Sequence, residues 1–141
     1  MKSSLAIVLL VLPLAACAIK EQVIPVALDS GAARDICVIN NPDVRQEFLD
    51  GYKRALEGRN FTVKILPERS SVQACPLTST YTAEWRWDLS LYLAYADLKI
   101  YRNGQVQGEA LYDSTQGGMN SGKFIHADAK IQELTNKLFA N

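Results

Sequence analysis

Two carboxylates in the middle of the chain have a spacing that could serve acid–base chemistry. Glu84 and Asp88 lie four residues apart and flank a pair of tryptophans. Two such groups on either side of a glycosidic bond could act as general acid and as base or nucleophile. The surrounding segment alternates apolar and polar residues, so both carboxylates fall on the polar face of a strand, with Arg86 between them. This pattern favours a solvated, ion-paired surface over a catalytic cleft.

A glycine-rich run near the C-terminal end has the outline of a phosphate-binding loop. Residues 117–123, Gly-Gly-Met-Asn-Ser-Gly-Lys, match the GxxxxGK pattern in which backbone amides and a lysine hold phosphates. The next residue is Phe124, so the hydroxyl that would bind magnesium is missing. The run also follows a predicted hairpin strand instead of a buried parallel strand. We therefore expect a flexible connection here and no nucleotide site.

The remaining residue types give no catalytic or metal-binding pattern. His126 is the only histidine, and no serine-centred elbow or cysteine partner accompanies it. Near the start of a predicted helix it is expected to cap that helix or to lie at the surface. Two distant cysteines and one histidine lack the spacing of a metal site. We expect no metal, no cofactor and no enzymatic activity.

Five aromatic residues cluster within seventeen positions of the chain. They could form a binding face for a peptide, glycan or lipid. Alternatively, they could fill the interface between a sheet and its helices, and the sequence favours this second interpretation. The five residues are Trp85, Trp87, Tyr92, Tyr95 and Tyr101.

The first half of the chain predicts a β-α-β unit. Residues 35–39 are apolar and β-rich, as in a buried strand. Asn40, Asn41 and Pro42 suit the start of a helix, whose apolar stripe runs from Val44 to residue 56 and which Gly58 would end. Residues 61–66 then alternate as a second strand.

The second half predicts an antiparallel meander and a closing helix. The apolar face moves from odd to even positions between residues 81 and 100, so a turn or bulge must lie between about Asp88 and Ala94. Asn103 and Gly104 are a type I′ hairpin signal. An amphipathic helix should start near 126–128. The expected fold is α+β, a mixed sheet of about four or five strands with two amphipathic helices mainly on one face, in the order β-α-β-β-β-α.

The N-terminal residues have the layout of a secretory signal peptide. Lys2 precedes an apolar run over residues 5–14, which is too short to span a bilayer as a stable helix. We therefore expect a signal peptide over 1–16, a tether over 17–33, and a single periplasmic domain over 34–141. Within the tether, Val23, Ile24 and Val26 could form a short edge strand. Removing Lys2 leaves 14 basic against 15 acidic residues, and this balance argues against a nucleic-acid partner.

The three cysteines divide into one and two. Leu-Ala-Ala before Cys17 matches the lipobox of bacterial lipoproteins, in which the cysteine carries the lipid. Cys37 and Cys75 then remain in an oxidising compartment, where a disulfide could form. Two buried free thiols are the alternative, because sequence alone does not show whether the Cα atoms come close enough.

Several runs resemble a group of small proteobacterial envelope lipoproteins of unassigned function. They are Tyr-Thr-Ala-Glu-Trp-Arg-Trp-Asp-Leu (81–89), Tyr-Leu-Ala-Tyr-Ala-Asp-Leu (92–98), Gly-Glu-Ala-Leu-Tyr-Asp (108–113) and Gly-Gly…Lys-Phe-Ile (117–125). The element order is also similar to the periplasmic α/β domains of curli-secretion and lipopolysaccharide-assembly lipoproteins. The resemblance implies a lipid anchor at Cys17 and, with Ala18 in place of Asp, sorting to the outer membrane, facing the periplasm.

These features predict a non-enzymatic binding or assembly-accessory module. Its expected partners are the membrane, through the N-terminal lipid, and an envelope protein. An envelope enzyme that acts on glycan or lipid through Glu84 and Asp88 is one alternative. A carrier of small hydrophobic ligands is another, and it would need an apolar cavity between the helices and the sheet.

Overall fold

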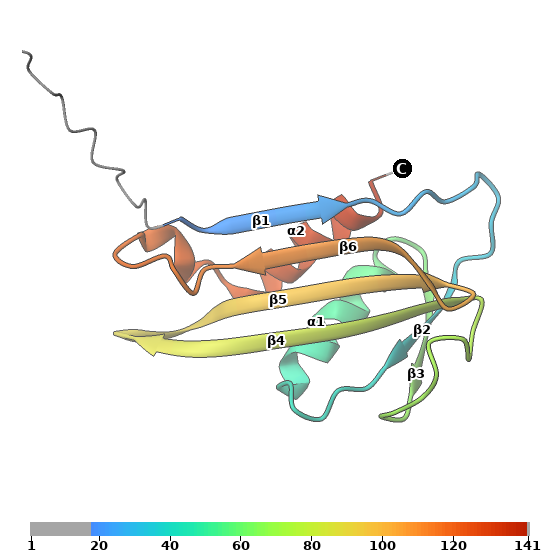
Figure 1. Cartoon of the computed structure of the whole chain (residues 1–141), viewed down its shortest axis with the longest axis horizontal. Helices are drawn as coiled ribbons and strands as arrows, with labels where there is room; N and C mark the ends of the chain where they lie inside the picture. Colours follow the sequence, from blue (N-terminus) through green and yellow to red (C-terminus); the bar gives the residue numbers. More distant parts are fainter. Residues whose placement is uncertain (1–17, 141) are drawn as a thin grey trace, which may run out of the picture.

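The computed structural model describes residues 18–140, which form one mixed sheet and two helices (Figure 1). The hydrogen-bonded strand order is β1-β6-β5-β4-β2-β3. The elements are β1 (Lys20–Ile24), β2 (Asp35–Ile39), α1 (Gln46–Glu57), β3 (Thr62–Leu66), β4 (Leu77–Asp88), β5 (Ser90–Arg102), β6 (Gln105–Asp113), a short 3₁₀-helix η1 (Ser121–Phe124) and α2 (Ala127–Leu138).

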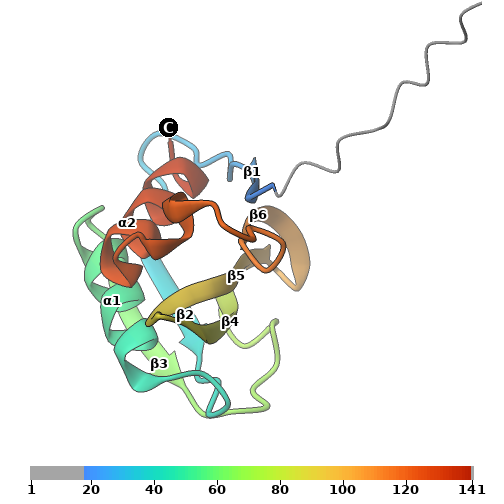
Figure 2. The ribbon, with the colours of Figure 1, turned by 90° about the vertical axis from the view of Figure 1, so that its left-hand side faces the viewer.

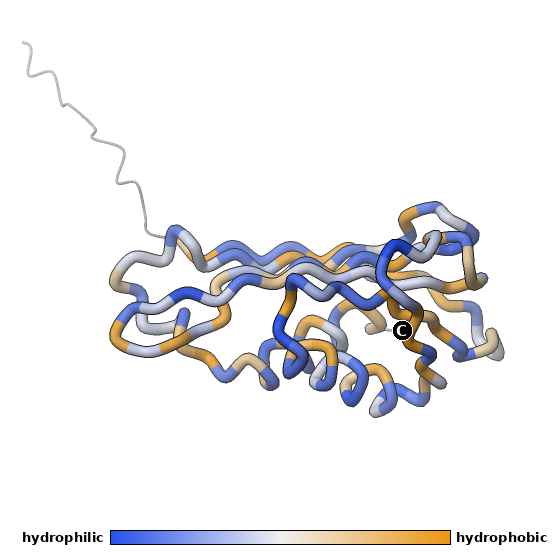
Figure 3. The backbone as a smooth tube through the Cα atoms, turned by 90° about the horizontal axis from the view of Figure 1, so that it is seen from below, coloured by the Kyte–Doolittle hydropathy of each residue, from blue (hydrophilic) through white to orange (hydrophobic). Residues whose placement is uncertain are grey.

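Both helices pack against one face of the sheet, and the other face carries no helix (Figure 2). In Figure 3 the helices run beneath the sheet, and hydrophobic and hydrophilic residues alternate along them, as in amphipathic helices. The interior between the two layers is apolar. Its largest members include Phe48, Tyr52 and Leu56 of α1, Ile131 and Leu134 of α2, and Leu98 and Ile100 of β5.

The predicted β-α-β unit is present, but its helix begins later than expected. Strands β2 and β3 pair in parallel, with Asp35 opposite Thr62. Asn41 does not cap the helix: its side chain donates to the Tyr81 carbonyl and accepts from the Asp43 amide. This turn joins the β2 end to β4, and α1 starts only at Gln46. The sequence signal was correct for a turn and wrong for the helix N-terminus.

The long apolar stretch forms two antiparallel strands, as the phase change predicted. The chain reverses at Leu89, between Asp88 and Ser90. A register shift between β4 and β5 lies a few residues from this turn, at Glu84/Trp85. The bulge explains why the helix-facing residues are odd-numbered in β4 and even-numbered in most of β5. At the other end of β5, Asn103 and Gly104 both have positive φ, as a type I′ turn requires.

The strand count of four or five is wrong, because the structure has six strands. The additional strand is β1, which lies inside the segment predicted as a tether. It pairs antiparallel with β6, from Lys20 opposite Asp113 to Ile24 opposite Glu109. Val23 packs against the core from this edge. Only residues 25–34 remain as a connection, and they cross from one edge of the sheet to β2.

Candidate functional site: an apolar tip beside the N-terminus

The five predicted aromatic residues do not share one surface. Trp85 faces the helices, where its ring meets Phe48 edge-on at 6.0 Å. Tyr92 is buried, and Tyr95 and Tyr101 are half-buried positions of β5. Only Trp87 projects clearly into solvent, with 73% of its surface exposed. Of the five, only Trp85 packs against the core between the sheet and the helices, so the expectation that the set fills that interface holds for one residue.

Trp87 belongs to a cluster of exposed apolar residues at one end of the molecule. The cluster lies at the β4–β5 turn and at the adjacent connection between β6 and α2 (Figure 1). Five of the eight exposed large hydrophobic side chains in the described part of the chain are found there. We call this surface the apolar tip, and it consists of Trp87, Leu89, Leu91, Met119 and Phe124. Isolated exposed apolar residues are ordinary, but several gathered at one end of a domain are a candidate interaction surface.

Leu89 occupies the hairpin turn in a backbone conformation that leucine rarely adopts. Its φ is +63°, in the left-handed region that glycine or asparagine usually takes. Its side chain is 91% exposed, so no packing in this protein compensates the backbone cost. An outlier of this kind supports a functional reading of the turn.

The buried ammonium group of Lys123 links the β4–β5 turn to the connection between β6 and α2. Lys123 is 4% exposed and forms an ion pair with Asp88 of the β4–β5 turn. It also donates to the Gly118 carbonyl and lies 5.3 Å from the centre of the Tyr92 ring. The Phe124 ring meets Tyr92 edge-on at 5.5 Å. These contacts hold the two segments of the apolar tip against each other.

The glycine-rich run is an exposed connection that is held at Lys123 and ends in a short 3₁₀-helix. Residues 121–124 form the 3₁₀-helix η1, which Asn120 caps by accepting from the Gly122 amide. The ammonium group that a phosphate would need is the buried group of Lys123, and Asp88 already pairs with it. This arrangement agrees with the sequence argument against a nucleotide site.

Glu84 and Asp88 do not form a catalytic pair. Glu84 lies 3.9 Å from the Arg86 guanidinium, whereas Asp88 pairs with Lys123. Both carboxylate side chains are more than half exposed, at 58% and 52%. Neither carboxylate lines any of the four main cavities of the described residues.

His126 directly precedes α2, as expected, but its side chain makes no capping hydrogen bond. It lines a shallow pocket of about 290 Å³ with Arg45, Trp85 and Asp128. The Trp85 ring is already covered by the Arg45 guanidinium, 5.5 Å from the ring centre. Within residues 18–140, no group of three or more His, Cys, Asp or Glu side chains could hold a metal ion.

The described chain begins at the apolar tip. The Ile19 side chain lies beside Gly122, where an added Cβ would come within 3.4 Å of it. Lys20 then opens β1 opposite Asp113, the last residue of β6. Hydrogen bonds from Thr115 lower the pKa of the Asp113 carboxyl and outweigh the effect of burial. Cys17 and the predicted signal peptide over 1–16 lie outside the described residues.

The predicted disulfide is present between Cys37 of β2 and Cys75 of the β3–β4 connection. Their Cα atoms are 6.2 Å apart, within the range that a disulfide spans. The bond closes a loop with a sequence separation of 38 residues. It lies at the opposite end of the molecule from the tip. No helix within residues 18–140 has the length and apolar character needed to cross a membrane.

Two kinds of comparison with known proteins give no match, and a third shows a shared fold. No protein-family model and no curated protein matches the sequence. The solved structures include a PelC dodecamer from Paraburkholderia phytofirmans, with a TM-score of 0.61 and 16% identity over 88% of this chain and 99% of that one. A leucine-to-methionine variant of that PelC gives a TM-score of 0.60 and 14% identity over 86% and 97%. At this level of identity, the chain has the fold of PelC.

Proposed function

We propose that the chain is a lipid-anchored protein of the outer membrane, facing the periplasm, and that it acts as a non-enzymatic binding or assembly-accessory module. Its lipid would be carried by Cys17. In this proposal the apolar tip rests against the bilayer. The remaining surface, including the helix-free face of the sheet, is presented to a partner in the envelope.

One observation carries this orientation: the chain enters the fold at the apolar tip. Cys17 lies only three residues before Lys20, where β1 begins. Three residues span at most about 11 Å, so acyl chains on Cys17 would hold this end of the domain at the membrane surface. Tryptophan and leucine side chains suit that position, because their apolar groups enter the boundary between headgroups and acyl chains.

The absence of an assembled acid–base pair supports the non-enzymatic part of the proposal. Glu84 and Asp88 each have their own cationic partner, and His126 faces only a shallow pocket. A glycan-acting enzyme would need two carboxyl groups on either side of one sugar-binding cleft. The geometry therefore favours binding or assembly over the enzymatic alternative.

Self-association is part of the proposal. Both solved structures reported above are PelC dodecamers. Strands β1 and β3 are the two edges of the sheet, and each has one side free to meet a neighbouring subunit. Light scattering of the purified lipoprotein would report an oligomer, and a monomer at all concentrations would contradict this part.

The anchor is tested by the variant Cys17→Ala. We expect the protein to move from the membrane fraction to the soluble fraction, because two or more acyl chains give stable attachment and the tip alone gives reversible binding. Ser3→Ala in the signal peptide serves as the control and should stay in the membrane fraction. A Cys17→Ala protein that remains membrane-bound after a salt wash would contradict the lipid anchor.

A further inference from the structure

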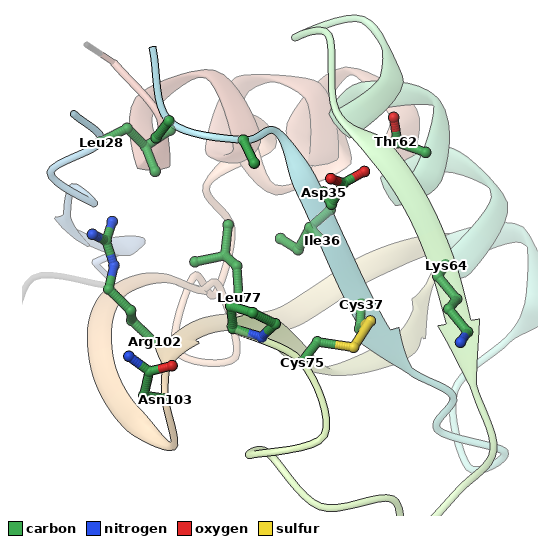
Figure 4. Close-up of a pocket in the computed structure, with 13 residues that line it drawn as sticks. Leu28, Asp35, Ile36, Cys37, Thr62, Lys64, Cys75, Leu77, Arg102 and Asn103 are labelled. Atoms are coloured by element: carbon green, nitrogen blue, oxygen red, sulfur yellow. A yellow bond between two sulfur atoms is a disulfide. The ribbon is translucent and has the colours of Figure 1, made fainter. Parts of the chain in front are cut away.

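A cavity of about 610 Å³ lies at the end of the molecule opposite the apolar tip (Figure 4). Its position follows from the meander, because the β4–β5 turn and the β5–β6 turn are at opposite ends of the sheet. The residues that line it include Arg102 and Asn103 of the β5–β6 turn and Asp35, Cys37 and Lys64 of β2 and β3. The alternate residues Ile36 and Val38 belong to the helix-side core. Ile36 and Leu77 of that core also line the cavity, so it lies at the end of the sheet and meets residues of both faces.

The inner wall of the cavity is apolar. The disulfide between Cys37 and Cys75 and the side chains of Ile36 and Leu77 form one part of it, and Leu28 approaches from the connection between β1 and β2 (Figure 4). The volume is in the range of small-molecule sites, which combine an apolar lining with a few polar groups. The carrier alternative placed such a cavity between the helices and the sheet, whereas this one lies at the end of the sheet beside the connection between β1 and β2.

The walls are fixed by covalent and hydrogen bonds, so the cavity exists before any ligand arrives. Arg102 Nη2 donates to the Ala27 carbonyl at 2.9 Å and holds the connecting segment over the sheet. The Asn103 amide donates to the Pro76 carbonyl at 3.0 Å. The disulfide joins the β3–β4 connection to β2. A preformed site of this kind binds with a smaller ordering cost.

The charged groups of the lining favour an anion near Arg102. The lining contains two cations, Arg102 and Lys64, and one carboxylate, Asp35. Asp35 and Lys64 both lie on the β2–β3 side of the cavity. Arg102 lies on the opposite side of the cavity (Figure 4). Within residues 18–140, the carboxylate that pairs with Arg102 is Asp29, at 3.8 Å and with a side chain 90% exposed.

We propose that this cavity binds a single-chain anionic amphiphile. The acyl chain would lie against the disulfide and Leu77, and the carboxylate or phosphate head would lie at Arg102. The guanidinium is one-third exposed, and its Nε has no hydrogen-bond partner within the described residues. The inference goes beyond the proposed function and does not depend on the anchor at Cys17.

The ligand class is tested by isothermal titration of the chain from residue 18 onward with amphiphiles below their micellar concentrations. Affinity for alkanoates of eight to fourteen carbons should rise about fourfold per added methylene until the cavity is full. Dodecanoate should bind about tenfold more tightly than dodecanol or dodecyltrimethylammonium. Dodecyl phosphate is compared with dodecanoate. The ratio of their two affinities shows whether the site prefers the phosphate head group of a lipid or the carboxylate of a free fatty acid.

The location is tested by variants on the connecting segment and at the head site. Ala33→Trp places a large ring at an exposed position of the cavity wall and should weaken dodecanoate binding at least tenfold. Ser30→Trp, exposed on the same segment outside the lining, is the matched control and should bind as the wild type does. Arg102→Gln should remove the preference for anions and keep the dependence on chain length.

Three results would overturn the inference. They are an affinity that does not change with chain length, equal binding of anionic and cationic amphiphiles, and wild-type binding by Ala33→Trp. The first two results come from the chain without substitutions. They therefore remain valid even if Arg102→Gln loosens the connecting segment that Arg102 holds through Ala27.

Discussion

Leu89 shows how one side chain can be costly to the fold and useful at a surface. A left-handed conformation costs an ordinary residue about 1 kcal/mol or more relative to glycine, which adopts it freely. The exposed leucine side chain gains nothing from the folded protein in return. If the apolar tip contacts the bilayer, burial of that side chain would offset the cost, since a fully buried leucine contributes about 1.5–3 kcal/mol.

We therefore expect Leu89→Gly to separate stability from membrane binding. The free energy of unfolding in urea should rise by about 0.5–1 kcal/mol, because glycine relieves the strained backbone. Binding of the chain from residue 18 onward to lipid vesicles, measured by co-sedimentation, should fall about tenfold.

Leu91→Gly is the matched control, because Leu91 is also exposed at the tip but lies in strand β5 with negative φ. Glycine in a strand interior is destabilising, so this variant should lower both stability and vesicle binding. Unchanged vesicle binding in both variants would show that the tip does not contact lipid.

At the scale of elements, a cluster of four charged residues joins the N-terminal strand to the C-terminal helix. Glu21 of β1 accepts hydrogen bonds from Lys130 and Lys137 of α2. Both lysines also pair with Glu133, one turn away on the same helix. Lys130 is 7% exposed, so its charge depends on these carboxylates for compensation.

This cluster predicts a loss of stability in acid. Hydrogen bonds from Lys130 and Lys137 lower the pKa of Glu133 below its ordinary 4.5. Burial raises the pKa of Glu21, but the same two lysines outweigh it, and the net pKa is also lowered. Carboxyls with a lowered pKa contribute stability above their unfolded pKa, and that contribution disappears as the pH falls through the folded value.

The free energy of unfolding should accordingly decline between about pH 5 and pH 3. Glu133→Gln should reduce this slope, because the group no longer titrates. Lys137→Met should also reduce it, because both carboxyls lose a hydrogen-bond donor. Urea denaturation at a series of pH values measures the slope, and an identical slope in both variants would show that the cluster does not control it.

The elements that the sequence predicted are those with local signals. Asn103 and Gly104 fix their turn through their own backbone preferences, and the change of apolar phase located the reversal at Leu89 to within a few residues. The strand β1 was not predicted with this clarity, since its pairing partner β6 is about ninety residues away in the chain. Asn41 suggested a helix start because an Asn followed by Pro suits that position, but its amide bonds to Tyr81 instead.

The candidate site was predictable only in part for the same reason. Trp87 was one of the five aromatic residues that the sequence offered for a binding face, although the sequence favoured an interior role for the set. Met119 and Phe124 gave no such signal, because their place beside the hairpin depends on the buried pairing of Lys123 with Asp88. The cavity at Arg102 is formed by segments far apart in sequence, and no local pattern marks it.

At the scale of the whole molecule, the disulfide fastens the end that is distant from the tip. In the chain-entropy model, a closed loop of this length stabilises the fold by about 3–4 kcal/mol. The double variant Cys37→Ser/Cys75→Ser should lower the free energy of unfolding by that amount. Reduction of the native protein should have the same effect, and non-reducing mass spectrometry that finds two alkylatable thiols would contradict the bond.

The two ends of the sheet therefore have different properties. One end carries the apolar tip and the start of the described chain, and the other carries the disulfide and the cavity. With the tip on a membrane, the cavity would open toward the periplasm, where a soluble ligand or partner could reach it. The proposed anchor and the proposed ligand site would not compete for the same surface.

The pairing of β1 with β6 also determines how the protein would respond to force. The chain enters β1 at the end that we propose to face the membrane, so tension from the proposed anchor would act along the strand axis. The ladder hydrogen bonds from Lys20 to Ile24 lie perpendicular to that axis and would share the load together. The salt bridges of Glu21 to α2 would resist the same displacement. A lateral movement of the lipid would thus be transmitted to the whole sheet, and the domain would tilt with its anchor.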